Sequence, residues 1–258
     1  MKIGLITGTG LYSLPNLQNT AKEQIETPYG SVNVETGEWS GREVIFIPRH
    51  GKNHTIAPSD INYQANIYAL YQKGVKIILA TSVSGSLNID WKPGTFVFLD
   101  QFLDFTYGRK YTFYPLNGKL AHVNMTDPYC RETKKYIQKA ADELGIDIRK
   151  GGVYCCFNGP RFETRAEIRM VEMLGGNLVG QTNFPECVLA RELEMSYASI
   201  AIVSNYAAGI DEDLTASELT ENLSTLGDTV GHLFQRTIEL IPDDFDSPAF
   251  HSLDKAIL

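Results

Sequence analysis

An aromatic ring and a carboxylate stand side by side at Phe162 and Glu163. A Gly-Pro pair just before them predicts a turn. Thr164 and Glu167 have the spacing of a capping box, which predicts a helix starting directly after the pair. At such an exposed junction a flat heterocycle can stack on the ring, while the carboxylate accepts N–H donors from its edge. The segment therefore indicates a heterocycle site, although a core phenylalanine beside a solvated glutamate fits it equally well.

Three short motifs, each expected to follow a strand, offer ligands for an anion. The glycine-rich turn 7–10 can bring backbone N–H groups and the Thr9 hydroxyl onto a phosphate. Arg49, followed by His50, supplies a guanidinium suited to bidentate oxyanion contact, and the segment 81–86 adds hydroxyls and backbone donors. Each motif is weak alone, and a surface Arg-His pair is more often merely solvated. Because ligands bind at the carboxyl ends of strands in α/β sheets, their convergence predicts a phosphate site.

The elements that must position these groups alternate between strand-like and helix-like runs. This pattern predicts an α/β fold with a mostly central mixed sheet flanked by helices. Strands are expected at 2–7, 44–48, 76–81, 95–99, 151–157, 178–181 and 197–204, and helices at 59–73, 128–144, 164–174, 185–194 and 217–240. Asp127-Pro128 is expected to start the second helix and Gly145 to end it. No repeat or low-complexity linker divides the chain, so a single domain over residues 1–258 is expected.

Composition excludes several classes of function. The chain has 258 residues, 43% of them hydrophobic and 21% charged, and a net charge of −8. That acidic balance argues against nucleic acid as a partner, because a phosphate backbone requires a basic surface. No apolar run approaches the roughly 20 residues of a membrane-spanning helix. The N-terminal apolar run is too short for a signal peptide. Four cysteines without metal-ligand spacing are interpreted as reduced thiols of a cytoplasmic protein.

Longer motifs resemble a known family. Residues 49–58 and 62–67 resemble the methylthioadenosine phosphorylase branch of the trimeric purine nucleoside phosphorylases. The segments 94–104, 159–167, 182–186 and 197–201 extend the resemblance over nearly the whole chain. It implies a nucleoside phosphorylase domain with a distorted central sheet, assembled as a homotrimer or a hexamer. The implied reaction is reversible phosphorolysis of a purine nucleoside to the free base and a ribose 1-phosphate, with inorganic phosphate as co-substrate and no metal or organic cofactor.

The same resemblance carries over a phosphate site. By motif position the site falls on Thr9, Arg49, His50, Ser82, the backbone N–H of Val83, and Thr182. Phosphate attacks the anomeric carbon while the glycosidic bond breaks, so such a site must hold an anion against a developing ribosyl cation. The Arg49 guanidinium is expected to face the anion alone. His122 matches a histidine that crosses the subunit boundary to cover the neighbour's ribose, and Gln181 stands where the family usually has a methionine under the ribose.

The base pocket indicates the substrate class. The resemblance places Phe162, Glu163, Asn205 and Ala207 around the base, with Asn205, Glu163 and His50 as the catalytic groups. Glu163 and Asn205 match the branch that cleaves inosine and guanosine. A 6-oxopurine offers an N1–H that Glu163 accepts and an O6/N7 edge that the Asn205 amide serves. A 6-aminopurine would leave these partners mismatched, at roughly 1–3 kcal/mol each, so 6-oxopurine nucleosides are the expected substrates.

The 5′ end of the ribose is expected to meet Ala216 and Leu219. The segment 205–231 contains no histidine that could bond a 5′-hydroxyl, and the apolar pair suits a methylthio group. S-Methyl-5′-thioinosine is therefore the predicted best substrate, ahead of inosine and guanosine. Thr215 or Ser217 could instead rotate in and serve the hydroxyl.

Three other functions stay open. The first is an S-methyl-5′-thioadenosine phosphorylase. The second is an NAD-dependent or nucleotide-binding protein built on the glycine-rich turn, but it needs a third glycine, an opening helix and an acidic residue about 20 positions further on. The loop-like segment before Tyr29-Gly30 does not provide these. The third is a non-catalytic purine-binding protein that kept the fold and lost the chemistry.

Overall fold

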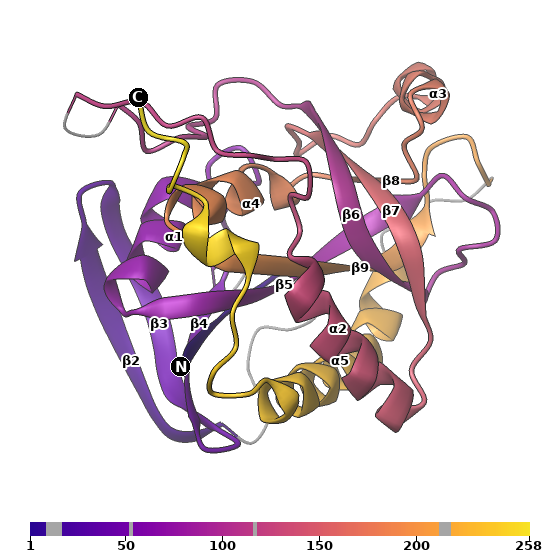
Figure 1. Ribbon diagram of the computed structural model, residues 1–258. Coiled ribbons are helices and arrows are strands. Elements are labelled where there is room, and N and C mark those ends of the chain that lie inside the picture. Colours follow the sequence, from indigo (N-terminus) through magenta and orange to yellow (C-terminus); the bar gives the residue numbers. More distant parts are fainter. Residues whose placement is uncertain (9–16, 52–53, 116–117, 212–217) are drawn as a thin grey trace.

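The structure is a computed structural model that describes the chain except for residues 9–16, 52–53, 116–117 and 212–217, and residues 218–225 without their side chains. Its strands are β1 (Lys2–Thr7), β2 (Gln18–Thr27), β3 (Gly30–Trp39), β4 (Arg42–Pro48), β5 (Val75–Ser86), β6 (Phe96–Phe105), β7 (Ile148–Phe157), β8 (Leu178–Gly180) and β9 (Ser196–Tyr206). Its helices are α1 (Tyr63–Gln72), α2 (Arg131–Leu144), α3 (Arg165–Met173), α4 (Asn183–Glu192), α5 (Glu218–Leu240) and the 3₁₀ turn η1 (Pro248–His251). The strands form one mixed nine-stranded sheet flanked by helices (Figure 1), so the predicted fold class is confirmed.

The centre of the sheet is parallel and buried on both faces. β1 pairs in parallel with β4 on one side and β5 on the other. β1, β4 and the first half of β5 are rich in apolar residues, which is typical of parallel strands covered by helices. Their side chains alternate between two hydrophobic clusters, so that Ile6 joins one and Leu5 the other.

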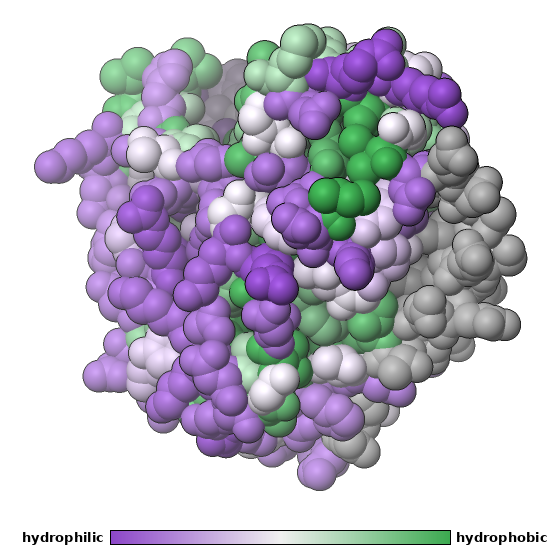
Figure 2. Space-filling view, turned by 90° about the vertical axis from the view of Figure 1, so that its right-hand side faces the viewer, coloured by the Kyte–Doolittle hydropathy of each residue, from purple (hydrophilic) through white to green (hydrophobic). Residues whose placement is uncertain are grey.

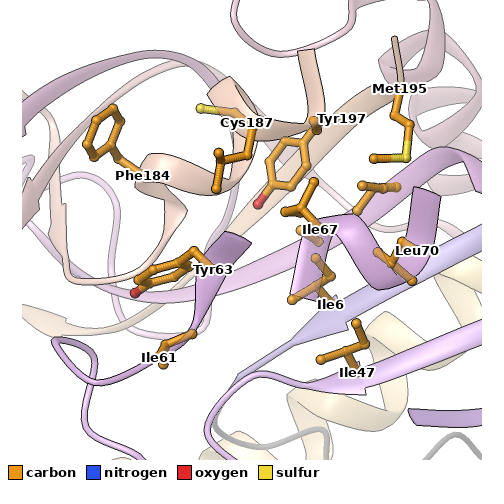
Figure 3. Packing of buried hydrophobic residues seen from close by; sticks show 14 of the residues in the cluster. Ile6, Ile47, Ile61, Tyr63, Ile67, Leu70, Phe184, Cys187, Met195 and Tyr197 are labelled. Atoms are coloured by element: carbon orange, nitrogen blue, oxygen red, sulfur yellow. The ribbon is translucent and has the colours of Figure 1, made fainter. Parts of the chain in front are cut away.

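One cluster lies under α1 and α4, and the other lies under α2 and α5 (Figure 1). In the first, Ile67 and Leu70 of α1 pack over Ile6 and Ile47 of the sheet (Figure 3). In the second, apolar residues repeat along α5 at three-to-four spacing, the period that turns one helical face to a core. Among its described residues, those that join this cluster as buried side chains are Val230, Leu233, Phe234 and Ile238.

The other half of the sheet closes on itself. β5 pairs with β8 at its C-terminal end and with β9 along most of its length. β9 in turn pairs with β6, β6 with β7, and β7 with β8. This ring is the distortion that the family resemblance implied, and it brings the ends of β5, β8 and β9 together next to the end of β4.

Several predicted boundaries were wrong. The hairpin of β2 and β3 was missed, and the segment before Tyr29-Gly30 is strand rather than loop. β2 is polar along its length because it is an exposed edge strand, so it carries no apolar signal. β5 extends to Ser86 because its pairing with β9 continues that far, so the hydroxyl segment 81–86 lies within the strand instead of following it.

Some helix ends were predicted correctly and others were not. α2 starts three residues later than expected, with Cys130 as its N-cap, while Asp127 forms an ion pair with Arg131. Gly145 ends that helix with a φ of 68°, a left-handed conformation that favours glycine. The capping box that opens α3 is present as predicted. No helix in the described part of the chain combines the length and apolar character needed to cross a membrane.

A candidate active site where the strands end

A cavity of about 360 Å³ opens where β1, β4, β5, β8 and β9 meet. The predicted site residues that line it are Arg49, His50, Val83, Phe162, Glu163, Gln181, Thr182, Asn205 and Ala207. Ser82 lies beside it, with its hydroxyl oxygen 3.5 Å from that of Thr182. Thr9 and Ala216 fall outside the described residues, as does the side chain of Leu219. The structure thus gathers residues from distant parts of the chain at one place.

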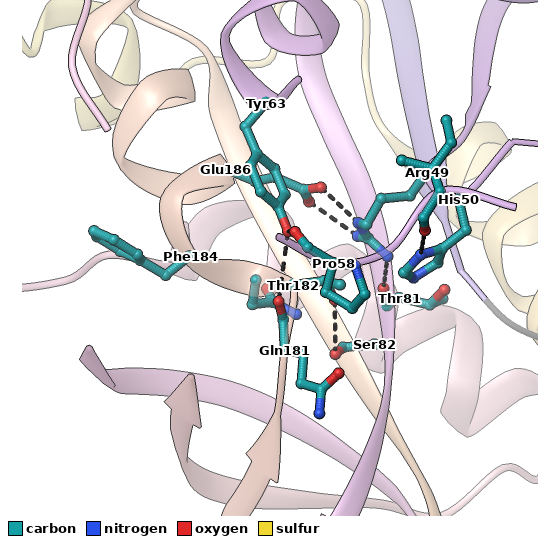
Figure 4. Close-up of polar contacts among 12 residues, drawn as sticks. Arg49, His50, Pro58, Tyr63, Thr81, Ser82, Gln181, Thr182, Phe184 and Glu186 are labelled. Carbon is teal, nitrogen blue, oxygen red and sulfur yellow. Dashed lines mark hydrogen bonds and ion pairs between the residues drawn. The ribbon is translucent and has the colours of Figure 1, made fainter. Parts of the chain in front are cut away.

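Arg49 lies at the end of β4 and is held by a carboxylate, so the expectation that it faces an anion alone was wrong. Its Nε contacts Glu186 Oε1 at 2.5 Å and its Nη2 contacts Oε2 at 2.9 Å, while Nη1 donates to the Thr81 carbonyl at 2.9 Å (Figure 4). Neither side chain of the pair is exposed. Burial lowers the pKa of Arg49, but the charge and hydrogen bonds of Glu186 outweigh it and raise the pKa above its ordinary value. Arg49 is therefore a fixed cation whose charge Glu186 balances.

Tyr197 on β9 completes this pair. Its hydroxyl donates to Glu186 Oε2 at 2.7 Å, and it lies 3.2 Å from Asn183 Oδ1. Burial raises the pKa of Tyr197 well above its ordinary range, and the adjacent Glu186 charge adds to the effect. The phenol therefore stays a donor, and the plane of the Glu186 carboxylate is fixed from both sides.

His50 presents an acceptor to the cavity. Its Nδ1 lies 2.9 Å from the Ile56 carbonyl, which can only accept, so Nδ1 carries the proton of the neutral ring. Burial lowers the pKa of His50 to about 4, assisted by Arg49 and His54 and opposed by the Ile56 carbonyl. The ring is thus neutral at pH 7, with a lone pair on Nε2. A side chain at Gly8 would start 3.1 Å from Arg49 Nη1 and 3.9 Å from His50 Nε2, so glycine leaves both groups open.

A tyrosine that the sequence analysis missed organises the predicted hydroxyl ligands. The Ser82 hydroxyl donates to the hydroxyl oxygen of Tyr154 at 3.0 Å, and the Thr182 backbone N–H donates to the same oxygen at 3.1 Å. Tyr154 is fully buried on β7. It reaches the site because Gly180 has no side chain, since a Cβ there would lie 2.2 Å from its hydroxyl. No local sequence signal distinguishes this tyrosine from a core residue.

The two neighbouring residues of the first motif differ in solvent exposure. Phe162 is 60% exposed, whereas Glu163 is 8% exposed, so the expectation that both lie at an exposed junction was wrong for Glu163. Glu163 Oε1 is buried and has no hydrogen-bond partner among the described residues. Burial raises the pKa of Glu163, although hydrogen bonds from its own backbone and from Gln181 oppose this. The cavity therefore contains a buried acceptor without a donor.

Asn205 and Gln181 are oriented by their neighbours. Asn205 Oδ1 accepts from the Ser204 hydroxyl at 2.6 Å, and one Nδ2 hydrogen goes to the Tyr206 carbonyl at 2.7 Å. Within the described part of the chain, the second Nδ2 hydrogen has no hydrogen-bond acceptor. Gln181 Nε2 donates to the Arg161 carbonyl at 3.1 Å. Ala207 is buried beside them, with its N–H bonded to the Ser86 carbonyl at 2.7 Å.

His122 lies elsewhere. It is exposed and lines a second cavity of about 760 Å³, which Arg191 and His251 also line. Its backbone N–H donates to the Ala256 carbonyl at 2.8 Å, which ties its segment to the C-terminal residues. Within one subunit it is separate from the strand-end cavity.

The face next to the strand-end cavity is partly hydrophobic. Figure 2 shows the side of the molecule on which α3 lies, with hydrophobic residues gathered on its upper part among hydrophilic ones. Large exposed hydrophobic side chains in this part of the chain include Phe162 (60%), Met173 (81%) and Leu174 (58%).

The fold and site define a known class. Residues 2–239 match the family model described as the phosphorylase superfamily, and the chain belongs to that family. It is 49% identical to a probable 6-oxopurine nucleoside phosphorylase of Thermococcus kodakarensis, over 99% of this chain and 98% of the relative. It is 45% identical to a probable S-methyl-5′-thioinosine phosphorylase of Methanopyrus kandleri, over 99% and 98% of the two chains.

Solved structures agree with this assignment. A methylthioadenosine phosphorylase from an antarctic soil metagenomic library has a TM-score of 0.93 at 36% identity, covering 99% of this chain and 92% of that one. The methylthioadenosine phosphorylase of Schistosoma mansoni in complex with adenine has a TM-score of 0.91 at 32% identity, covering 98% and 96%.

Proposed function

We propose that this chain catalyses the reversible, phosphate-dependent cleavage of the N-glycosidic bond of 6-oxopurine nucleosides. The products are the free purine and ribose 1-phosphate, or 5-methylthioribose 1-phosphate. The observation that supports the substrate class is the buried Oε1 of Glu163, which has no hydrogen-bond partner among the described residues and lies in the cavity that also holds Arg49 and His50. A purine N1–H is the donor that this oxygen lacks.

In this proposal the phosphate is held mainly by oriented donors. The assigned ligands are Thr9, Arg49, His50, Ser82, the Val83 backbone N–H and Thr182. Because Glu186 balances the charge of Arg49, the guanidinium contributes directed N–H groups more than net charge. His50 Nε2 accepts a hydrogen bond from a protonated phosphate oxygen, which orients another oxygen for attack.

Bond exchange then needs little acid or base chemistry. A phosphate oxygen forms a bond to C1′ as the bond from C1′ to purine N9 breaks, and the electron pair leaves with the purine. The purine then takes up the proton that the hydrogen phosphate brought into the site, so the free base is neutral. Negative charge spreads over the purine toward O6 and N7, where the free Nδ2 hydrogen of Asn205 donates. Glu163 accepts the N1–H at the same time, and Phe162 covers the face of the ring.

The 5′ preference rests on sequence. Ala216 and Leu219 are proposed to line the 5′ end and to favour a methylthio group over a hydroxyl. The Thermofilum pendens relative, 44% identical over 100% of this chain and 99% of its own length, is named an S-methyl-5′-thioadenosine phosphorylase. That name shares the methylthio group with the proposed substrate but differs in the base. That activity is the second candidate function.

A homotrimer, which could pair into a hexamer, is part of the proposal, with His122 of one subunit covering the ribose site of its neighbour. The exposed hydrophobic side chains of Phe162, Met173 and Leu174 support burial against another copy. The proposal includes no metal or organic cofactor. A cytoplasmic location is supported by the four buried thiols.

A substrate panel tests the proposal. Hypoxanthine and adenine nucleosides are each supplied with a 5′-hydroxyl or a 5′-methylthio group, with and without phosphate, and base release is followed. We expect release only with phosphate, and kcat/KM for methylthioinosine above that for inosine by about tenfold to a few hundredfold.

Each other outcome selects another function. Faster adenine substrates would indicate a methylthioadenosine phosphorylase, and equal rates for inosine and methylthioinosine would indicate a general 6-oxopurine enzyme. Purine binding without turnover would indicate a non-catalytic purine-binding protein.

A further inference from the structure

Arg109 is a buried cation beside the cavity, and the described part of the chain gives it no acidic partner. It is 9% exposed, and its guanidinium lies 5.1 Å from the centre of the Tyr63 ring. A buried charge without a counter-ion is costly unless hydrogen bonds satisfy it. Among the described residues, its oxygen acceptors are all backbone carbonyls.

Those carbonyls belong to three segments of the candidate active site. Nη1 donates to the Phe184 carbonyl at 2.5 Å. Nη2 lies 2.8 Å from the Gln181 carbonyl and 3.1 Å from that of Asn158, with the Phe157 carbonyl further away at 3.3 Å. A single nitrogen therefore joins the end of β7 to the turn after β8.

Two of these segments lead directly to a proposed substrate contact, and the third leads to the partner of one. Asn158 precedes the turn that carries Phe162 and Glu163. Gln181 precedes Thr182, and Phe184 lies in the first turn of α4, which carries Glu186, the partner of Arg49.

The Gln181–Thr182 peptide links Arg109 to the phosphate-binding residues through hydrogen bonds on its two sides. Its carbonyl accepts from Arg109, and its N–H, which points to the opposite side of a trans peptide, donates to Tyr154. Tyr154 also receives the Ser82 hydroxyl. The orientation of both proposed phosphate hydroxyls thus depends on a peptide that Arg109 holds in place.

We propose that Arg109 is a positioning residue that fixes the base-binding segment and the phosphate-binding segment relative to each other, an inference that rests on the proposed function. Arg109 also adds a positive charge beside the cavity that no described acidic residue pairs with, because Glu186 is already paired with Arg49. Two substitutions of Arg109 separate the effect of its hydrogen-bond geometry from the effect of its charge.

Arg109→Lys keeps the charge but loses the planar fork that reaches several carbonyls at once. We expect higher KM values for both inosine and phosphate, and a kcat lower by about a hundredfold, the effect of misplacing reacting groups by about 1 Å. Arg109→Met also removes the charge, so its KM for phosphate should rise above that of Arg109→Lys. Arg42→Lys is the matched control, because Arg42 donates to the Ile241 carbonyl at 2.5 Å and pairs with Asp243 outside the cavity.

A purely structural role gives a different pattern. Partial unfolding lowers the amount of active enzyme and Vmax but leaves both KM values unchanged. Wild-type KM values in folded Arg109→Lys would overturn the proposal, and this variant decides the matter if Arg109→Met does not fold.

Calorimetric binding of hypoxanthine and of phosphate separates this proposal from the function. If the wild type binds both without turnover, the proposed function fails, and weaker binding of both to Arg109→Lys still supports the positioning role. Equal dissociation constants in the two proteins would overturn it, and a wild type that binds neither ligand would overturn both proposals.

Discussion

The carboxylate of Glu186 holds the guanidinium of Arg49 through two parallel contacts, with Nε to Oε1 at 2.5 Å and Nη2 to Oε2 at 2.9 Å. Such a bidentate pair fixes the plane of the guanidinium as well as its position. Both side chains are fully buried, so each one depends on the other for its solvation.

Removing one member of this pair should harm stability more than removing both. Arg49→Met leaves Glu186 buried without its cation, and we expect a loss of about 3–5 kcal/mol in the free energy of unfolding. The double variant Arg49→Met, Glu186→Met should recover much of that loss, as measured by urea denaturation.

The same variants test whether Arg49 binds phosphate. In whichever of them remains folded, we expect a higher KM for phosphate and little change in purine binding. A wild-type KM for phosphate there would remove Arg49 from the phosphate site.

The lowered pKa of His50 predicts that part of the free energy of unfolding depends on pH. Its folded pKa of about 4 lies below the ordinary value of 6.5 in the unfolded chain, so its contribution is present above pH 6.5 and is lost as pH falls toward 4. The full effect is about 3 kcal/mol. Urea unfolding of wild type and His50→Asn at neutral pH and at about pH 4.5 measures it. The wild type should lose more stability than the variant between these conditions, and parallel losses would place the titration elsewhere.

Replacing the Glu163 carboxylate should lower activity without lowering the stability of the fold. Burial raises its pKa, so its ionised form is disfavoured in the folded state, and that carboxyl contributes stability that is lost as pH rises through its folded pKa. We expect Glu163→Gln to be at least as stable as wild type at pH 7. Its kcat/KM for inosine should fall by about ten- to a hundredfold, because an amide is a poorer acceptor for N1–H. Glu192→Gln is the control, since Glu192 is also buried with a raised pKa but bonds Thr112 and Phe113.

Mixed subunits test the role of His122. His122→Ala and Glu163→Gln should each have low activity, but refolding them together should restore part of it. A Glu163-containing pocket can then receive His122 from a Glu163→Gln neighbour. His251→Ala, which changes another histidine of the second cavity, should retain activity. No gain on mixing would argue against a shared site.

The sequence predicted the parts of the fold that carry strong apolar periodicity. β1 was predicted to the residue, and all five α-helices were located within a few residues. The β2–β3 hairpin was missed because β2 lies on the sheet edge, where most of its side chains face solvent. The length of β5 was underestimated because its last residues are held by pairing with β9, a partner distant in the sequence.

The candidate site shows the same division. Local motifs pointed to Arg49 and Glu163, and the family resemblance pointed to Asn205, and all three line one cavity. Glu186, Tyr154 and Arg109 were not identified because they act through contacts with residues far along the chain. Arg49 and Glu186 are 137 residues apart, and Ser82 and Tyr154 are 72 apart.

The pairing of β5 with β9 also limits how early β5 can complete its folding while the protein is being synthesised. Ser84 and Ser204, which lie on these two strands, are 120 residues apart. At about 5–20 residues per second, translation leaves β5 without this neighbour for several seconds or more. During that time its apolar edge is available to other chains, and Arg49 has no carboxylate to neutralise it. Nascent chains that stop short of β9 should therefore need chaperone protection, and the proposed phosphate site can form only after most of the protein has left the ribosome.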